Sequence, residues 1–392
     1  MEEKKLVPKR RFKGYERDWN IITLEEISQK VGDGLHGTPK YNDSGDVYFI
    51  NGSNIFSGKI NIYEDTKTVT KYEQSSDDLL LDNQTILLSV NGTIGNLAFY
   101  NGEEIMLGKS VAFIMLKSNE KQYIYYYLQT SNVNNYFLNS LTGSTIKNLG
   151  LKQIKETKVA LPVIKEQQKI GAFFKVLDER IANQERKVAK VKALKNAYLT
   201  EMFPQEGETV PKRRFKGFEG EWNETILDSV LAYEQPTDYI VDEDSYDDSY
   251  DIPVLTAGQS FLLGYTNEKL GIKKADVNNS VIIFDDFTTS SHHVDFFFKV
   301  KSSALKILSS NSRKYSTYFA HLILKNIDYT PESHERHWIS IFSNFEVMTP
   351  SMEEQQKIGE FFKNLDNQIR LEEKKLDKLQ KMKEAYLEEM FV

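Results

Sequence analysis

EQQKIGAFFKVLDERIANQERKVAKVKALKNAYLTEMF, residues 166–203, and EQQKIGEFFKNLDNQIRLEEKKLDKLQKMKEAYLEEMF, residues 354–391, are two copies of one segment. Aligned without gaps over 165–203 and 353–391, the copies are identical at 22 of 39 positions. A second repeat, VPKRRFKGYERDWN at 7–20 and VPKRRFKGFEGEWN at 210–223, is identical at 11 of 14 positions. We call the shorter repeat the head. A head, a globular segment and a copy of the longer repeat therefore follow one another twice along the chain, which indicates an internal duplication.

Both copies of the longer repeat are predicted to be helical. Each follows a proline, Pro162 or Pro350, and neither contains one. Apolar residues recur at alternating spacings of four and three, which predicts a coiled-coil seam that also serves partner binding. The seam residues are Ile170, Phe174, Leu177, Ile181, Val188, Val191, Tyr198 and Met202 in the first copy and Ile358, Phe362, Leu365, Ile369, Leu376, Leu379, Tyr386 and Met390 in the second.

Polar residues interrupt both seams at the same two places, Gln184 with Glu372 and Lys195 with Lys383. They either fix the register of the helices or mark partial exposure to solvent, and the sequence does not choose between these. The two copies suggest an approximate two-fold axis. If that axis crosses the two helices, the helices pack antiparallel. About 39 residues at 1.5 Å each give a rod of roughly 58 Å, so we expect the globular segments at its opposite ends.

The globular segments 21–160 and 224–348 share few residues but present similar predicted elements in the same order. DVYFINGSNI parallels DIPVLTAGQS, QTILLSVNGTIGNLAFY parallels SVIIFDDFTTSSHHVDF, and a helix-like stretch follows in both. We predict an α+β fold in which two mixed α/β domains are separated by two long antiparallel coiled-coil helices, with pseudo-two-fold symmetry. The predicted bounds are 1–164 for the first head and domain, 165–203 for the first long helix, 204–352 for the second head and domain, and 353–392 for the second long helix.

Composition excludes several classes of protein. The 392 residues are 40% hydrophobic, contain no cysteine and carry a net charge of −7. The absence of cysteine excludes disulfides and thiolate zinc sites and fits a reducing cytoplasm. No apolar run reaches the roughly 18 residues of a membrane span, and the basic N-terminus lacks the apolar stretch of a secretory signal. An acidic cluster from Glu234 to Asp251 is expected to be a solvated loop facing away from DNA.

With these residues in hand, the chain resembles the specificity subunit of Type I restriction–modification systems. The VPKRRFKG…W head, the EQQKIG…FF…LD start and the AYL-x-EMF end match that family's repeated framework, and DGLHGTPKY, GSTIKNL, PVLTAG and IIFDDF resemble its target-recognition domains. The resemblance implies two target-recognition domains that each read half of a split double-stranded DNA site. It also implies one copy of the chain per complex, two modification subunits that carry S-adenosylmethionine, and restriction subunits that join them. A coiled-coil scaffold or adaptor without DNA reading is the alternative, and an active methyltransferase or nuclease is a further rival.

We expect no catalytic residue, cofactor or metal site in the chain itself. It lacks the [DN]-PP-[YF] run of adenine methyltransferases and a strand-flanked G-x-G-x-x-G. GEEIMLGKS at 102–110 has five residues between its glycines and suits a strand better than a phosphate loop. HERH at 334–337 lacks a third metal ligand. Asp285 and Asp286 are expected to cap a turn or to accept a hydrogen bond from a cytosine amino group.

Candidate DNA-reading residues are polar side chains in turns, because amides, hydroxyls and guanidinium groups read base edges. For each, an ordinary solvated loop residue is the alternative, and Trp338 is expected in the core. Arg10, Arg11, Arg213 and Arg214 in the heads contact phosphates or partner subunits, or serve only as solubilising charge. The candidates are His36, Thr38, Lys40, Tyr41, Asn51, Asn54, Asn91, Thr93, Ser144, Thr145 and Lys147 in the first module and Thr256, Gln259, Thr288, Thr289, His292, His293, His334 and Arg336 in the second.

Overall fold

The computed structural model of the chain describes residues 6–118, 120–143, 147–257, 260–331 and 336–392. These residues divide into two units, one formed by Met1–Glu185 with Lys374–Val392 and the other by Arg186–Glu373. Each unit contains one globular module, the start of one long helix and the end of the other. The mixture of strands and helices, duplicated around two long helices, confirms the predicted fold class.

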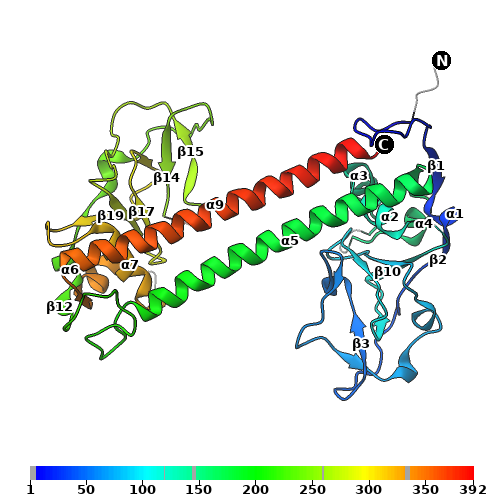
Figure 1. Cartoon of the computed structure of the whole chain (residues 1–392), viewed down its shortest axis with the longest axis horizontal. Coiled ribbons are helices and arrows are strands. Elements are labelled where there is room, and N and C mark those ends of the chain that lie inside the picture. The colour runs from blue at the N-terminus through cyan, green and yellow to red at the C-terminus, as the bar shows by residue number, and fades with distance from the viewer. Residues whose placement is uncertain (1–5, 119, 144–146, 258–259, 332–335) are drawn as a thin grey trace. The chain divides into compact units, whose positions relative to one another are not determined.

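The described residues of the first module, predicted as 21–160, form three sheets and a short hairpin, and Figure 1 shows the module beside the start of the first long helix. One sheet pairs β1 (Asn20–Thr23) with β11 (Lys158–Leu161). A four-stranded sheet has the order β2 (Ser28–Asp33), β10 (Val111–Leu116), β7 (Thr85–Ser89) and β8 (Leu97–Phe99). A three-stranded sheet has the order β6 (Thr68–Val69), β3 (Val47–Ile50) and β9 (Ile105–Leu107), and β4 (Ile55–Phe56) pairs with β5 (Lys59–Ile60). The α-helices are α1 (Leu24–Ile27), α2 (Lys121–Tyr127), α3 (Ser131–Asn139) and α4 (Leu151–Lys155).

The second module, residues 224–348, repeats the three sheets of the first in the same strand order, and no counterpart of the β4–β5 hairpin occurs in its described residues. β12 (Asn223–Ile226) pairs with β20 (Glu346–Thr349), as β1 pairs with β11. Its four-stranded sheet has the order β13 (Leu231–Glu234), β19 (Leu305–Ser310), β16 (Val281–Asp285) and β17 (Ser291–Val294), and its three-stranded sheet has the order β15 (Leu262–Thr266), β14 (Ile252–Leu255) and β18 (Lys299–Val300). The α-helices are α6 (Leu227–Val230), α7 (Thr317–Asn326) and α8 (His337–Ser340). The two dissimilar sequences therefore form their sheets from strands in the same order, as predicted.

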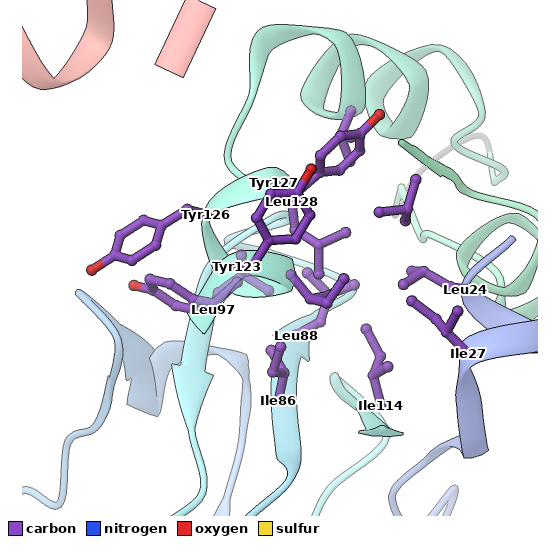
Figure 2. Close-up of a cluster of buried hydrophobic side chains, with 14 of the residues drawn as sticks. Leu24, Ile27, Ile86, Leu88, Leu97, Ile114, Tyr123, Tyr126, Tyr127 and Leu128 are labelled. Atoms are coloured by element: carbon purple, nitrogen blue, oxygen red, sulfur yellow. The ribbon is translucent and has the colours of Figure 1, made fainter. Parts of the chain in front are cut away.

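The core of the first module explains why every residue of β7 and β10 is buried. Ile86, Leu88 and Ile114 face α2 and pack below Tyr123 and Tyr127 (Figure 2). Leu87 and Phe113, on the opposite face of the same strands, belong to a second buried cluster. Because both faces of the sheet are covered, the usual alternation of polar and apolar residues is absent.

The long helices α5 (Ile164–Glu201) and α9 (Met352–Met390) pack antiparallel within each unit. In the first unit the rings of Phe174 and Phe391 stack with centroids 5.5 Å apart. In the second unit the rings of Tyr198 and Phe361 meet at 5.1 Å. Of the predicted seam, Ile170, Phe174, Leu177, Val188, Ile358, Phe362 and Leu365 are buried, and Ile181, Ile369 and Leu376 are partly buried.

The two lysines that interrupt the seam, Lys195 and Lys383, form ion pairs between the two helices. Lys383 lies 2.7 Å from Asp178 in the first unit, and Lys195 pairs with Asp366 in the second. The two pairs are equivalent, because 178 and 366, like 195 and 383, occupy the same positions of the repeat. A tyrosine of the adjoining module also donates to each aspartate, Tyr126 at 2.9 Å and Tyr318 at 2.5 Å. Burial raises the pKa of both phenols, which keeps them protonated as donors.

The arginines of the heads bind the ends of the long helices. The guanidinium group of Arg11 makes a bidentate contact with the carboxylate of the buried Glu166, with N···O distances of 2.7 and 2.8 Å. Arg214 makes the same bidentate contact with Glu354, with both N···O distances at 2.7 Å. Arg10 pairs with Glu389, and Arg213 pairs with Glu201. These four side chains therefore hold the framework together, a role that differs from all three predicted for the heads from the sequence.

Candidate DNA interface

The predicted reading turns of the first module meet around one short turn, residues 108–110. The Ser110 hydroxyl accepts a hydrogen bond from Gly52 N at 2.8 Å and lies 3.1 Å from the side-chain oxygen of Asn51. Leu35 bridges to Gly108, which brings the loop that carries His36 to the same place. Asn91 bridges to Asn148, which adds the segment that carries Lys147. The structure thus brings four sequence-distant candidate segments together.

Two glycines allow this close convergence of backbones. A Cβ atom on Gly52 would lie 2.5 Å from the Ser89 hydroxyl oxygen, and one on Gly108 would lie 2.5 Å from the Asn51 side-chain oxygen. Both distances are below any real carbon contact, so larger residues would push the turns apart. The loops of the first module are therefore held by packing as well as by hydrogen bonds.

Individual candidates of the first module differ in how they are placed. His36, Thr38, Lys40, Tyr41 and Lys147 are exposed, with His36 lying 2.7 Å from Asp33 and the Tyr41 ring packing on Phe49. Asn54 is buried, and its amide donates to the Asn61 carbonyl at 2.9 Å. The Thr93 hydroxyl donates to the Gly52 carbonyl at 3.0 Å.

Asn54 consequently holds the turn of residues 51–54, and its side chain is not presented to a ligand. Its place corrects the prediction that it reads DNA, because the sequence does not reveal which amide of the turn points inward. Asn51, Asn91 and Thr93 border the same turns, and their role in reading DNA stays a prediction. Ser144 and Thr145 lie outside the described residues.

The predicted turns of the second module also converge. Ser290 donates through its hydroxyl to the Ala257 carbonyl at 2.9 Å, which joins the turn after β16 to the loop after β14. The His292 ring stacks on Phe261 with centroids 4.2 Å apart. Asp286 accepts hydrogen bonds from the backbone of His337 at 3.0 Å and Trp338 at 2.9 Å, which adds the segment that begins at Arg336.

Within this second cluster, Thr288 and Arg336 are exposed, and Thr256, Thr289 and His292 are partly buried. Thr289 has a positive φ of 59°, which marks a tight turn. Asp285 accepts from the backbone N–H groups of Phe287 and Thr288 at 2.8 and 3.0 Å, which confirms it as the turn cap. Gln259 and His334 lie outside the described residues.

His293 is placed differently from its neighbour His292. Its ring packs edge-on against Tyr318, and desolvation lowers its pKa to about 4. Burial also lowers the pKa of His292. His293 thus faces α7 and the long helix, which argues against the predicted DNA contact. Alternation along β17 places neighbouring side chains on opposite faces, so only one of the two histidines can face the loop cluster.

The sequence did not single out Lys109, which lies at the centre of the first cluster. Lys109 is exposed between the buried Gly108 and Ser110. The run GEEIMLGKS is predicted to suit a strand better than a phosphate loop, and its middle is strand β9, as expected. The signal in the sequence that could have indicated Lys109 is the Gly-Lys-Ser run of residues 108–110 directly after the apolar run of residues 105–107.

No group of metal-binding side chains was found among the residues that the structure describes. His337, from the sequence run considered for metal binding, is fully buried with its Nδ1 3.2 Å from the Tyr329 hydroxyl. Trp338 is buried against Phe284 as part of the core, as expected. None of the described helices combines the length and apolar character that a membrane crossing needs.

A family model described as Type I restriction modification DNA specificity domain matches residues 16–193 and again residues 219–381. The chain belongs to this specificity family. The assignment confirms the function expected from the sequence, a specificity subunit of a Type I restriction–modification system, and does not favour the scaffold alternative. The doubled match follows the internal repeat.

Relatives of this specificity subunit agree with the assignment. The chain is 43% identical to the Escherichia coli Type I restriction enzyme EcoR124I/EcoR124II specificity subunit over 146 residues, 36% of this chain and about a third (35%) of that protein. It is 20% identical to a putative Type I restriction enzyme MjaX specificity subunit of Methanocaldococcus jannaschii, across 94% of this chain and 92% of that one. The crystal structure of a Type I restriction–modification S subunit from M. genitalium has a TM-score of 0.65 at 16% identity and covers 98% of this chain and 99% of that chain, which shows the shared fold.

Proposed function

We propose that each loop cluster reads one half of a bipartite, asymmetric double-stranded DNA site. The observation that carries the proposal is that the two modules share one strand topology but differ in the residues of their loop clusters. The strand order of the three sheets is the same in both modules, whereas Asn51 and Gly52 after β3 of the first module are replaced by Thr256 and Ala257 at the equivalent places after β14 of the second. A duplicated fold that presents different loop residues in its two copies fits a ligand made of two different halves.

The chemistry of the exposed candidates suits base reading. Arginine and lysine pair with guanine in the major groove, and amides and hydroxyls pair with other base edges. Rigid placement of such side chains reduces the entropy lost on binding. We further propose that the antiparallel helices α5 and α9 fix the separation between the two half-sites.

The long helices are proposed to bind two modification subunits, to which restriction subunits attach, with one copy of this chain per complex. Several apolar side chains on and next to α5 are exposed, including Ile164 at 45%, Val176 at 49% and Leu194 at 44%. Apolar groups on a charged helix surface are typical of faces that a partner covers. The proposed S-adenosylmethionine site belongs to the modification subunit, and this chain is proposed to carry no chemistry. We propose that the chain functions in the cytoplasm, because a protein without cysteine fits a reducing compartment.

Footprinting of the assembled complex tests the proposal. We expect two separated protected patches with unrelated sequences, each lost when bases in that patch alone are changed. A single patch, or protection that ignores sequence, would contradict bipartite reading. As a control for catalysis, the purified chain is incubated alone with DNA and labelled S-adenosylmethionine. Methyl transfer by the lone chain would show that it is itself an enzyme.

A further inference from the structure

The second module buries an ion pair where the first module has two apolar residues. Lys306 on β19 is fully buried, Asp286 just after β16 is 2% exposed, and the ammonium nitrogen lies 3.4 Å from the carboxylate. The first module has Ala112 and Val90 at the equivalent places, both buried in its core.

Backbone hydrogen bonds establish this equivalence. Leu149 N donates to the Val90 carbonyl at 2.8 Å in the first module, and His337 N donates to the Asp286 carbonyl at 3.0 Å in the second. In the sheets, Ser89 pairs with Val111, and Asp285 pairs with Leu305. One residue further along each strand lie Ala112 and Lys306. The shared frame therefore does not require charges at this place.

The ion pair connects three segments of the second module. One Asp286 oxygen accepts from the Trp338 backbone N–H at 2.9 Å, and the other faces Lys306. The Lys306 ammonium also donates to the side-chain oxygen of Gln235 at 3.2 Å and lies over the Tyr233 ring at 5.6 Å. The end of β13, the turn after β16 and the segment before α8 thus meet at one charged contact.

Stability alone does not account for such a pair. Taking two charges out of water has a large cost, and well-packed apolar residues of similar volume often serve stability equally well or better. The first module shows that the same frame accepts the apolar solution. A directional contact does supply geometry, since it fixes where the segment carrying Arg336 lies relative to the turn of Phe287–Ser290.

We propose that Asp286 and Lys306 are positioning residues for sequence reading by the second module. They hold Arg336 and the turn Phe287–Ser290 in one geometry, so that the two segments read neighbouring bases together. The inference rests on the proposed function, in which this cluster reads one half-site. It adds that the accuracy at that half-site depends on a buried contact that itself touches no DNA.

The test uses the assembled complex carrying Asp286→Asn together with Lys306→Met, which removes both charges and keeps the shapes. Discrimination is measured as the ratio of affinities for the cognate site and for sites with one base pair changed. We expect about a tenfold or greater loss of discrimination at the second half-site, the scale of one mismatched base pair, and no change at the first. Lys306→Arg keeps the charge and is expected to retain discrimination.

A matched control is a second ion pair of the same module, between the buried Lys299 and the partly buried Glu268, whose charged atoms lie 2.6 Å apart. Glu268→Gln with Lys299→Met removes a comparable pair outside the contact between Asp286 and Trp338, and is expected to leave discrimination unchanged. Equal losses in both double variants would reduce the effect to general loosening and overturn the proposal.

A second variant and a second readout cover the case in which the double variant does not fold. Asp286→Glu retains both charges but displaces the contact, and is expected to lower discrimination at the second half-site and speed hydrogen exchange of the Trp338 amide. Unchanged discrimination in a folded, assembled Asp286 variant would overturn the inference alone. A wild-type complex without a second half-site would instead overturn the proposed function and the inference with it.

Discussion

Glu166 and Glu354 are buried carboxylates at equivalent positions, each held by one arginine of a head. Neither arginine is visible from the sequence as a structural residue, because a basic run reads equally well as a DNA or partner contact. The three-dimensional pairing decides, since a buried carboxylate requires a charged or hydrogen-bonding partner. Lys9 and Lys13 beside them remain available for other contacts in the described part of the chain.

Replacing Arg214 by Met leaves Glu354, whose side chain is 1% exposed, without its partner. We expect the free energy of unfolding to fall by roughly 3 kcal/mol, because a buried charge is left uncompensated. Urea unfolding followed by circular dichroism measures the loss, and Lys216→Met in the same head is the control. A loss below about 1 kcal/mol would show that the pair does not hold the framework.

The buried His321 and the partly buried His293 of the second unit predict acid sensitivity. Burial lowers the pKa of His321 to about 3 and that of His293 to about 4. Unfolded, each has a pKa near 6.5, so below that pH the unfolded state binds more protons and stability falls. From pH 7 to pH 5 we expect each histidine to remove about 2 kcal/mol, a loss that levels off only below the folded pKa values.

The change His321→Gln is expected to remove much of this pH dependence. Melting temperatures of wild type and variant at pH 7 and pH 5 give the comparison, with His36→Gln at an exposed site as the control. If the variant and the wild type lose the same stability on acidification, His321 is not buried in its neutral form.

At the scale of elements, the repeats made the long helices and the order of strands predictable. Period and identity survive in the sequence because the framework must pack in the same way twice. Inward or outward placement within a turn was not predictable, as Asn54 and His293 show, since it depends on which neighbouring strand covers the turn. The Lys–Asp pairs between helices were visible as polar seam positions, but their aspartate partners lie outside the apolar pattern.

Exchanging the charges of one such pair tests its contribution to helix packing. Lys383→Met removes the partner of Asp178, and we expect the first unit to lose about 1–2 kcal/mol of stability. The double change Lys383→Asp with Asp178→Lys is expected to recover part of it, measured as a coupling energy in a double-mutant cycle. Additive losses without recovery would mean that the two side chains do not interact.

At the scale of the whole molecule, duplication separates two tasks within one chain. The heads and the long helices are repeated in both halves, so they suit contacts that occur twice. The loop clusters differ, so they suit the two unlike halves of one site. This division follows from the sequence, whereas the bases that each cluster reads do not, because turns of this kind have no residue-to-base code.

Exchange of the first module tests the central claim most directly. Residues 21–160 are replaced by the corresponding module of a relative with a different site, and the sequence preference of the assembled complex is determined on a randomised DNA library. Bipartite reading predicts that one half-site changes to that of the relative while the other stays the same. A change in both half-sites, or in neither, would contradict it.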